Sequence, residues 1–347
     1  MADAADVQDN KQDNIFTAIL ESAKRNPDRV ALKGEGGRGR QYTYRELLTA
    51  ITALAAGLSA PRFADIAEVG LLAENRPEWP IAYLGILGAG KTVVPFDANL
   101  APGELKNLIR LSGVRLLLLS ARFASLLEYL PDSLTVYCLD GSYPENWQLL
   151  FVPAPDAASP RPPADPAALI YTSGTTGAPK AAMLSHRNIL SNSASATAAL
   201  ELFADDVFLS VLPLHHTLEA TCGFLTPLLV GATIVYARSL KSRQLIEDIR
   251  DNGVTVMIGV PLLFEKMHDG ILRAVRQAAW PRRAVFDFTT RLASFGLDRG
   301  KAWGKPLFAS LRRKAGLGSI RLFVCGGAPL PPEIARFFTL IGITFLQ

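Results

Sequence analysis

Short apolar runs that alternate with helical segments constrain the fold of this chain more than any other feature. Residues 69–72, 92–95 and 115–119 are typical of buried strands, and the segments between them carry apolar residues at helical spacing. The links between these elements are short. The alternation predicts an α/β fold, with doubly wound parallel sheets layered with helices.

With 347 residues the chain can bury more than one core. We expect a disordered tail at 1–13, a first α/β subdomain at 14–165 and a second at 166–347. Seven prolines between residues 140 and 166 predict an irregular connection between the two subdomains. The first 14 residues are polar and acidic, which excludes a signal peptide within them.

The longest uncharged run, residues 220–237, is interrupted by Pro227 and Gly231. It predicts a buried helix, a turn and a buried strand, with a membrane span as the alternative. Three cysteines lie far apart and form no disulfide framework or zinc spacing, which favours a reducing cytosol.

Residues 171–180, with the sequence Tyr-Thr-Ser-Gly-Thr-Thr-Gly-Ala-Pro-Lys, form the clearest candidate for a binding site. Glycines let backbone N–H groups turn toward an anion, the hydroxyls add donors, and Lys180 adds a positive charge. The pattern predicts a loop that wraps a polyphosphate, with a solvated turn as the alternative. It is not the nucleotide loop G-x-x-x-x-G-K-[ST], because Ala178 and Pro179 separate Gly177 from the lysine and a strand-like run follows.

These ten residues resemble the signature loop Y-T-S-G-T-T-G-x-P-K of the adenylate-forming enzymes, the superfamily of acyl-CoA synthetases, peptide-synthetase adenylation domains and firefly luciferase. The resemblance implies that the loop holds the β- and γ-phosphates of ATP. The implied phosphate-binding residues are Thr172, Ser173, Gly174, Thr175, Thr176, Gly177 and Lys180. Lys180 is also implied in catalysis.

Two adjacent histidines follow an apolar strand at residues 207–212, where side chains leave a sheet for a crevice. His216 matches the family pattern L-P-x-x-H, and the resemblance implies a catalytic role in which its ring shapes the carboxylate pocket. A structural histidine is the alternative. Metal binding is not expected, because His186 and His268 show no ligand spacing with the pair.

Two further stretches resemble pocket motifs of the same superfamily. The first is V-P-x-L-F-E-K of fatty acyl-CoA synthetases, and the second is the turn G-G-A-P-L. The resemblance implies an adenine and acyl pocket formed by Val260, Pro261, Phe264, Gly326, Gly327, Ala328 and Pro329. Core packing explains the apolar residues of the first stretch equally well.

Residues 270–320 are strongly basic, with eleven Arg and Lys against two acidic residues, so this segment carries +9 and the remainder −5. Aromatic and aliphatic residues are interleaved with the charges. Two interpretations remain open, a solvated surface over a core or amphipathic helices that contact an anionic membrane. Nucleic acid is not expected as a partner, since no recognised binding module accompanies the charge.

The resemblance extends from about Asn14 to Gln347 and implies the N-terminal large domain of the acyl-adenylate-forming fold, without its C-terminal domain. The family motif that supplies a magnesium-binding Glu would follow the last residue, so no metal ligand is expected in this chain. We therefore expect a truncated chain that is inactive alone, with an exposed sheet edge and apolar faces.

The implied activity is that of an ATP-dependent acyl-CoA synthetase, with ATP, Mg²⁺, a fatty acid and CoA as reactants, in the cytoplasm or peripherally on the inner membrane face. The alternatives are a non-catalytic nucleotide- or acyl-binding fragment, and a luciferase-like or aryl acid-activating member of the same fold. Oligomeric state, acyl chain length and pathway are not predicted.

Overall fold

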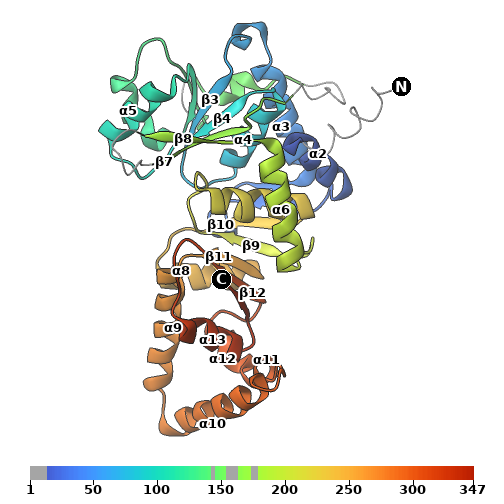
Figure 1. Cartoon of the computed structure of the whole chain (residues 1–347), viewed down its shortest axis with the longest axis vertical. Helices are drawn as coiled ribbons and strands as arrows, with labels where there is room; N and C mark the ends of the chain where they lie inside the picture. Colours follow the sequence, from blue (N-terminus) through green and yellow to red (C-terminus); the bar gives the residue numbers. More distant parts are fainter. Residues whose placement is uncertain (1–13, 142–144, 154–162, 173–178) are drawn as a thin grey trace. The chain divides into compact units, whose positions relative to one another are not determined.

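The computed structural model describes residues 14–141, 145–153, 163–172 and 179–347 (Figure 1). The chain divides into two compact units. Unit 1 takes the described residues of Met1–Leu32, Arg40–Ala204 and Pro213–Ala232, and unit 2 takes Lys33–Gly39, Asp205–Leu212 and Thr233–Gln347. The units interleave along the chain, so the division into consecutive subdomains at 14–165 and 166–347 stays a prediction. The tail at 1–13 lies outside the described residues.

Unit 1 is built on a six-stranded sheet in the order β6-β5-β3-β4-β7-β8. Its strands are β3 Glu68–Leu72, β4 Thr92–Pro95, β5 Leu116–Leu119, β6 Thr135–Cys138, β7 Ala168–Thr172 and β8 Lys180–Leu184. All neighbours pair in parallel except β7 and β8, which are antiparallel. The predicted parallel α/β sheet is confirmed.

The α-helices of unit 1 are α2 Ile15–Arg25, α3 Tyr44–Leu58, α4 Glu78–Gly88, α5 Pro102–Ser112, α6 His186–Leu200 and α7 Thr226–Val230. Residues 220–237 form the predicted helix, turn and strand, and the first helical part is the π-helix Glu219–Leu225. Shorter 3₁₀ segments are Glu35–Gly37, Pro61–Phe63, Ala121–Tyr129 and Trp147–Leu150, and two short strands are β1 Val30–Lys33 and β2 Gln41–Thr43. In the described part of the chain, no helix is both long and apolar enough to cross a membrane.

Local sequence signals explain where several helices begin. Thr43 accepts a hydrogen bond from the Glu46 N–H, and the Glu46 carboxylate accepts one from the Thr43 N–H, so α3 starts in a reciprocal capping box. Ser185 caps α6 in the same way through Asn188. These caps satisfy backbone donors that have no partner inside the helix.

The helix α4 is buried along nearly its whole length, and its glycines allow the close packing. A Cβ on Gly85 would lie 2.5 Å from Leu54 of α3, and one on Gly88 would lie 2.5 Å from Phe16 of α2. Larger residues at these two positions would force the helices apart.

Unit 2 contains five parallel strands in the order β13-β12-β11-β9-β10. They are β9 Val207–Ser210, β10 Thr233–Tyr236, β11 Val256–Gly259, β12 Leu322–Cys325 and β13 Thr344–Leu346. The helices are α8 Ser242–Asn252, α9 Pro261–Arg276, α10 Trp280–Leu297, α11 Gly304–Leu307, α12 Ala309–Lys314 and α13 Pro332–Leu340. The basic segment therefore folds as helices, with breaks before Pro281 and around Gly304.

An aromatic cluster forms part of the core of unit 2. Phe264 of α9 lies 5.1 Å from Phe323 of β12 and 5.0 Å from Phe345 of β13, measured between ring centroids. Phe338 of α13 stacks on Phe345 at 5.7 Å. Because burial of a Phe side chain contributes about 1.5–3 kcal/mol, this cluster ties the helices to the sheet.

The described part of the connection at 140–166 is less irregular than its prolines predicted. Trp147–Leu150 forms a 3₁₀ helix, and the Asn146 side chain caps it by accepting the Gln148 N–H. Trp147 and Leu150 are both buried. Prolines prevent long helices and strands in this stretch, but a single helical turn anchored by two apolar side chains fits between them.

Candidate functional site

The predicted phosphate loop joins two antiparallel strands. Thr172 ends β7, Lys180 begins β8, and the two residues are paired in register. Ser173, Gly174, Thr175, Thr176 and Gly177 lie outside the described residues. Since a strand follows Lys180, the prediction of a strand–loop–strand arrangement is confirmed and the helix of a G-x-x-x-x-G-K-[ST] loop is excluded.

The end of β7 and the end of β4 lie at the same edge of the unit 1 sheet. Val93 of β4 pairs with Ala168 of β7 in parallel, and the same number of residues leads from Val93 to Asp97 as from Ala168 to Thr172. The carboxyl ends of parallel strands are the usual ligand-binding edge of an open α/β sheet. The phosphate loop therefore starts beside the residues that follow β4.

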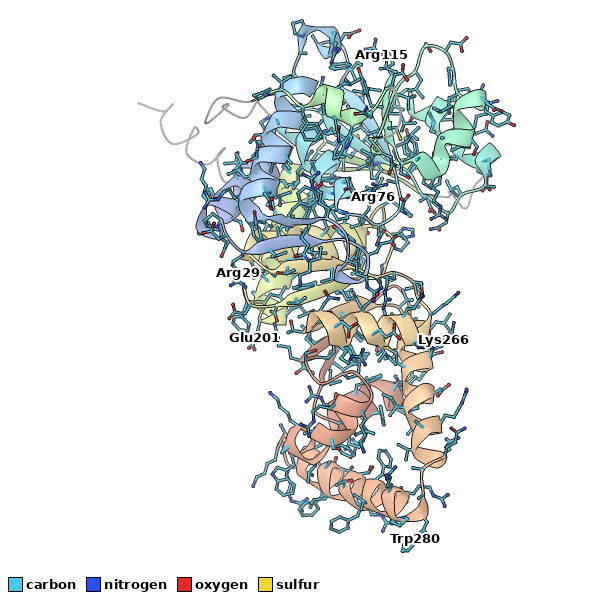
Figure 2. All side chains as sticks on the ribbon, turned by 180° about the vertical axis from the view of Figure 1, so that it is seen from behind. Arg29, Arg76, Arg115, Glu201, Lys266 and Trp280 are labelled. Carbon is cyan, nitrogen blue, oxygen red and sulfur yellow. The ribbon has the colours of Figure 1, made fainter. Side chains whose placement is uncertain are left out.

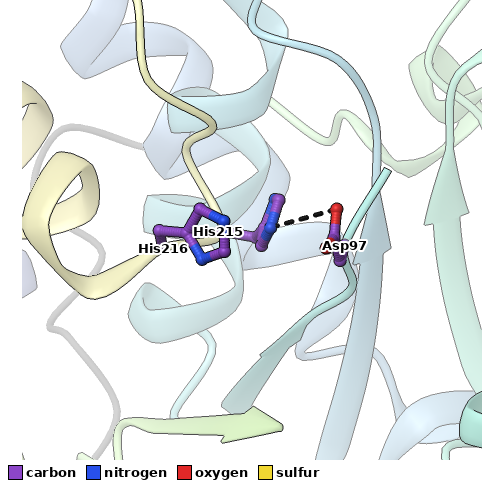
Figure 3. Close-up of side chains that lie close together, drawn as sticks. All are labelled: Asp97, His215 and His216. Atoms are coloured by element: carbon purple, nitrogen blue, oxygen red, sulfur yellow. Dashed lines mark ion pairs between the residues drawn. The ribbon is translucent and has the colours of Figure 1, made fainter. Parts of the chain in front are cut away.

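The two histidines lie in a turn at this edge (Figure 3). The Leu214 N–H donates to Asn75 Oδ1 at 3.1 Å, and Asn75 follows β3. His215 Nε2 lies 3.1 Å from Asp97 Oδ1, and the two imidazole centroids are 4.1 Å apart. Residues after β3 and β4 thus fix the histidine turn, which brings His216 to the edge where Thr172 and Lys180 lie.

The two rings differ in environment. His215 is buried, whereas His216 is exposed. Burial lowers the pKa of His215 to about 4, the charge of His216 adds to this effect, and Asp97 opposes it. At neutral pH the His215 ring is therefore uncharged, and His216 is the histidine that a substrate can reach.

A polar network lies along the same edge. Arg76 forms ion pairs with Glu78 at 2.8 Å, Asp140 at 3.0 Å and Glu74 at 3.4 Å. Burial works against the Arg76 charge, but hydrogen bonds to Glu78 and Asp140 outweigh it and raise the Arg76 pKa. The Ser120 hydroxyl donates to Glu74. This network joins the segments after β3, β5 and β6.

The other predicted pocket residues lie in unit 2, at the carboxyl ends of β11 and β12. The Gly326 N–H donates to the Gly259 carbonyl at 3.0 Å. Gly327 has φ +86°, which favours glycine, and a Cβ there would lie 3.7 Å from Val260. Val260, Gly327, Ala328 and Pro329 are exposed, so these residues form an accessible turn.

Pro261 and Phe264 belong to the core instead. Both are buried, and Phe264 packs in the aromatic cluster of unit 2. This is the alternative that the sequence left open for the apolar residues of this stretch. Their part in an acyl pocket stays a prediction.

Sequence reasoning missed Asn75 and Asp97. Their roles depend on contacts with a turn more than a hundred residues later in the chain. One signal was present for Asp97, since a polar residue directly after a buried strand is a candidate for the ligand-binding edge. No local pattern marked Asn75 as a residue that holds the histidine turn.

A model of the AMP-binding enzyme family matches residues 19–347. This chain belongs to that family. The predicted membership in the adenylate-forming superfamily is thereby confirmed.

Relatives in the family are acyl-CoA and aryl-CoA synthetases. The chain is 28% identical over 341 residues to peroxisomal long chain acyl-CoA synthetase 6 of Arabidopsis thaliana, covering 89% of this chain and 47% of that protein. It is 29% identical over 318 residues to feruloyl-CoA synthase of an Amycolatopsis species, covering 89% and 54%. The chain spans about half the length of the curated relatives it matches.

Solved structures share the fold. ATP-bound MatB from Rhodopseudomonas palustris superposes with a TM-score of 0.71 at 22% identity, covering 96% of this chain and 58% of that chain. The N-terminal domain of FACL13 from Mycobacterium tuberculosis gives 0.70 at 20% identity, covering 96% and 74%. The predicted N-terminal domain of the acyl-adenylate-forming fold is confirmed.

Proposed function

We propose that this chain supplies the ATP- and acid-binding part of an acyl-CoA synthetase. In that reaction a carboxylate attacks the α-phosphate of ATP to give an acyl-adenylate and pyrophosphate, and the CoA thiol then displaces AMP to give acyl-CoA. The observation that supports it best is the shared sheet edge of Thr172, Lys180 and His216 in unit 1. A phosphate-binding loop and a reachable imidazole at one edge would bring the phosphates of ATP and the acid close together.

Each residue has a distinct part in this proposal. Thr172, Lys180 and the loop between them would hold the β- and γ-phosphates and the departing pyrophosphate, with Lys180 offsetting the charge that gathers in the transition state. His216 would line the carboxylate pocket. Mg²⁺ would arrive with ATP as a counter-ion of the phosphates, and no residue of this chain is proposed as its ligand.

The acid is proposed to be a fatty acid, with an aryl acid as the alternative. Unit 2 contains a cavity of about 700 Å³ whose lining is mostly apolar. It is bordered by α8, α9, α10 and the segment of α11 and α12, with Met267, Ile271, Val285, Phe286 and Phe308 among its lining residues. A cavity of this size and lining can hold an aliphatic ligand within unit 2. The relatives include both fatty acyl-CoA and feruloyl-CoA synthetases, so an experiment must decide whether the acid is aliphatic or aryl.

Acid-dependent ATP–pyrophosphate exchange tests the activity. We would measure it for this chain and for a chain continued to the length of the relatives, with fatty and aryl acids. Exchange with fatty acids by the longer form, lost in Lys180→Ala and reduced in His216→Ala, supports the proposal. A silent longer form that still binds ATP would instead favour the non-catalytic nucleotide-binding alternative.

Peripheral contact with an anionic membrane, on the cytoplasmic face, is the second part of the proposal. The helix α10 exposes large apolar side chains, with exposed fractions of 72% for Trp280, which is labelled in Figure 2, and 68% for Phe288. Phe288, Leu292 and Phe295 recur at helical spacing, and Arg291 lies beside them. An exposed apolar stripe flanked by arginine is the pattern of an interfacial helix.

A pair of matched variants tests this contact. Phe288→Glu should abolish co-sedimentation with phosphatidylserine vesicles, whereas Phe203→Glu, at an exposed phenylalanine of unit 1, should leave it unchanged. Equal sedimentation of both variants and the original chain would count against membrane contact through α10.

A further inference from the structure

Asp97, His215 and His216 bring one carboxylate and two imidazoles together in unit 1 (Figure 3). One ligand atom from each side chain lies within 4.8 Å of the other two. Within the part of the chain that the structure describes, no other three His, Cys, Asp or Glu side chains meet this criterion. The cluster is a local concentration of metal-binding atoms.

The buried ring of His215 presents a nitrogen that the protein does not satisfy. His215 Nε2 lies 3.1 Å from Asp97 Oδ1, yet it has no hydrogen-bond partner among the described residues, so the two atoms are close without the geometry of a hydrogen bond. The same Asp97 oxygen accepts the Asn99 N–H at 2.8 Å. A cation bound by both Nε2 and the carboxylate would satisfy this pair.

The backbone holds the two histidines in place. The Leu214 N–H is bound by Asn75, and the His216 N–H donates to the Pro213 carbonyl at 3.1 Å. The two rings are tilted by 51° rather than stacked. Side-chain rotation would have to bring the ligand atoms, which lie within 4.8 Å of one another, to the Zn–N distance of about 2.0–2.1 Å from a single ion. The exposed ring of His216 leaves an open path for the ion and a coordination position for water.

We propose that Asp97, His215 and His216 bind a divalent transition metal, with Zn²⁺ as the best match. Two imidazoles and one carboxylate form a ligand set that Zn²⁺ uses when one position stays open to solvent. Mg²⁺ prefers oxygen ligands alone, so the magnesium of ATP does not belong here. The sequence predicted no metal site because it compared only the spacing of histidines. The third ligand, Asp97, follows β4 and is far from the histidine pair in the sequence.

Zn²⁺ in this site has a consequence for catalysis that rests on the proposed function. A metal-bound His216 is no longer available to the acid, so Zn²⁺ would inhibit acid activation. Zn²⁺ binding can be measured without any enzymatic activity. If Zn²⁺ binds but does not inhibit acid activation, the role of His216 in the proposed function is wrong and the metal site stands.

Calorimetric titration with Zn²⁺ and the absorption spectrum of the Co²⁺-loaded protein test the site. The original chain should bind one Zn²⁺ saturably, and Asp97→Asn and His216→Gln should each weaken binding about tenfold or more. The matched control is His268→Gln, because His268 lies 3.1 Å from Asp269 and the described residues offer no third ligand there. This variant should bind as the original chain does. Thermal unfolding would verify that each variant is folded.

Several outcomes would overturn the site. These are an absence of saturable Zn²⁺ binding, equal binding by the original chain and both ligand variants, and loss of binding in His268→Gln. A thiolate-to-Co²⁺ charge-transfer band would also overturn it, since it would assign the metal to a cysteine such as Cys222.

Discussion

His186 shows how burial fixes the protonation state of an imidazole in this protein. It begins α6, is buried, and its Nδ1 accepts the Ile15 N–H at 3.2 Å. Burial lowers the His186 pKa, while Asp165 and the Ala164 carbonyl oppose the effect. Only the neutral ring can accept this hydrogen bond, so protonation would remove the bond that joins α6 to the start of α2.

We therefore expect His186 to make stability fall in mild acid. Its folded pKa lies below the unfolded value of about 6.5, so its contribution is present above that pH and is lost as the pH falls below it. Between about pH 7.5 and 5.5, the free energy of unfolding should fall more in the original chain than in His186→Asn, by on the order of 1 kcal/mol. Urea unfolding at several pH values measures this. A pH dependence that His186→Asn leaves unchanged would contradict it, and His268→Asn is the control.

At the level of elements, local signals located most of the fold. Thr43 and Ser185, both residue types that favour helix N-caps, cap α3 and α6, and the strand-like run after Pro179 forms β8. These features depend on a few neighbouring residues. The contacts of Asn75 and Asp97 with the histidine turn depend on the order of strands in a sheet, which no local pattern specifies.

The glycines of two helices illustrate the same distinction. Both Gly57 and Gly270 lie in helices, where glycine costs about 0.5–1 kcal/mol relative to alanine. In the structure a Cβ on Gly57 would lie 1.6 Å from the Leu150 carbonyl oxygen. Nothing lies within 4 Å of a Cβ on Gly270.

Alanine should therefore have opposite effects at these two positions. Gly57→Ala must push the 3₁₀ helix Trp147–Leu150 away from α3, and we expect a loss of about 1–3 kcal/mol. Gly270→Ala should gain about 0.5–1 kcal/mol. Chemical denaturation of both variants checks the sign and size. Similar changes in the two variants would mean that the contact with Leu150 does not restrict Gly57.

For contact of the whole molecule with an anionic membrane, the distribution of charge along the chain matters more than the net charge. The chain carries +4, but residues 270–320 carry +9. Some of this charge is internal, because Arg312 is buried and donates to the Ile320 carbonyl at 2.6 Å. The guanidinium of Arg299 lies 3.4 Å from the centroid of the Phe295 ring. The outward-facing charge of the segment is thus smaller than its formal value and lies among exposed aromatic rings.

This arrangement predicts a two-part response of vesicle binding to salt. Raising NaCl from about 0.1 M to about 1 M shortens the screening length from about 10 Å to about 3 Å, which weakens attraction between exposed arginines and anionic lipid. The apolar contact of α10 is not screened. Reversal of Arg282 and Arg283, both exposed, should therefore reduce binding at low salt only, whereas Phe288→Glu should reduce it at every salt concentration. Co-sedimentation across a salt series measures both effects. If binding by the original chain disappears completely at high salt, the apolar stripe contributes nothing, and the contact is electrostatic alone.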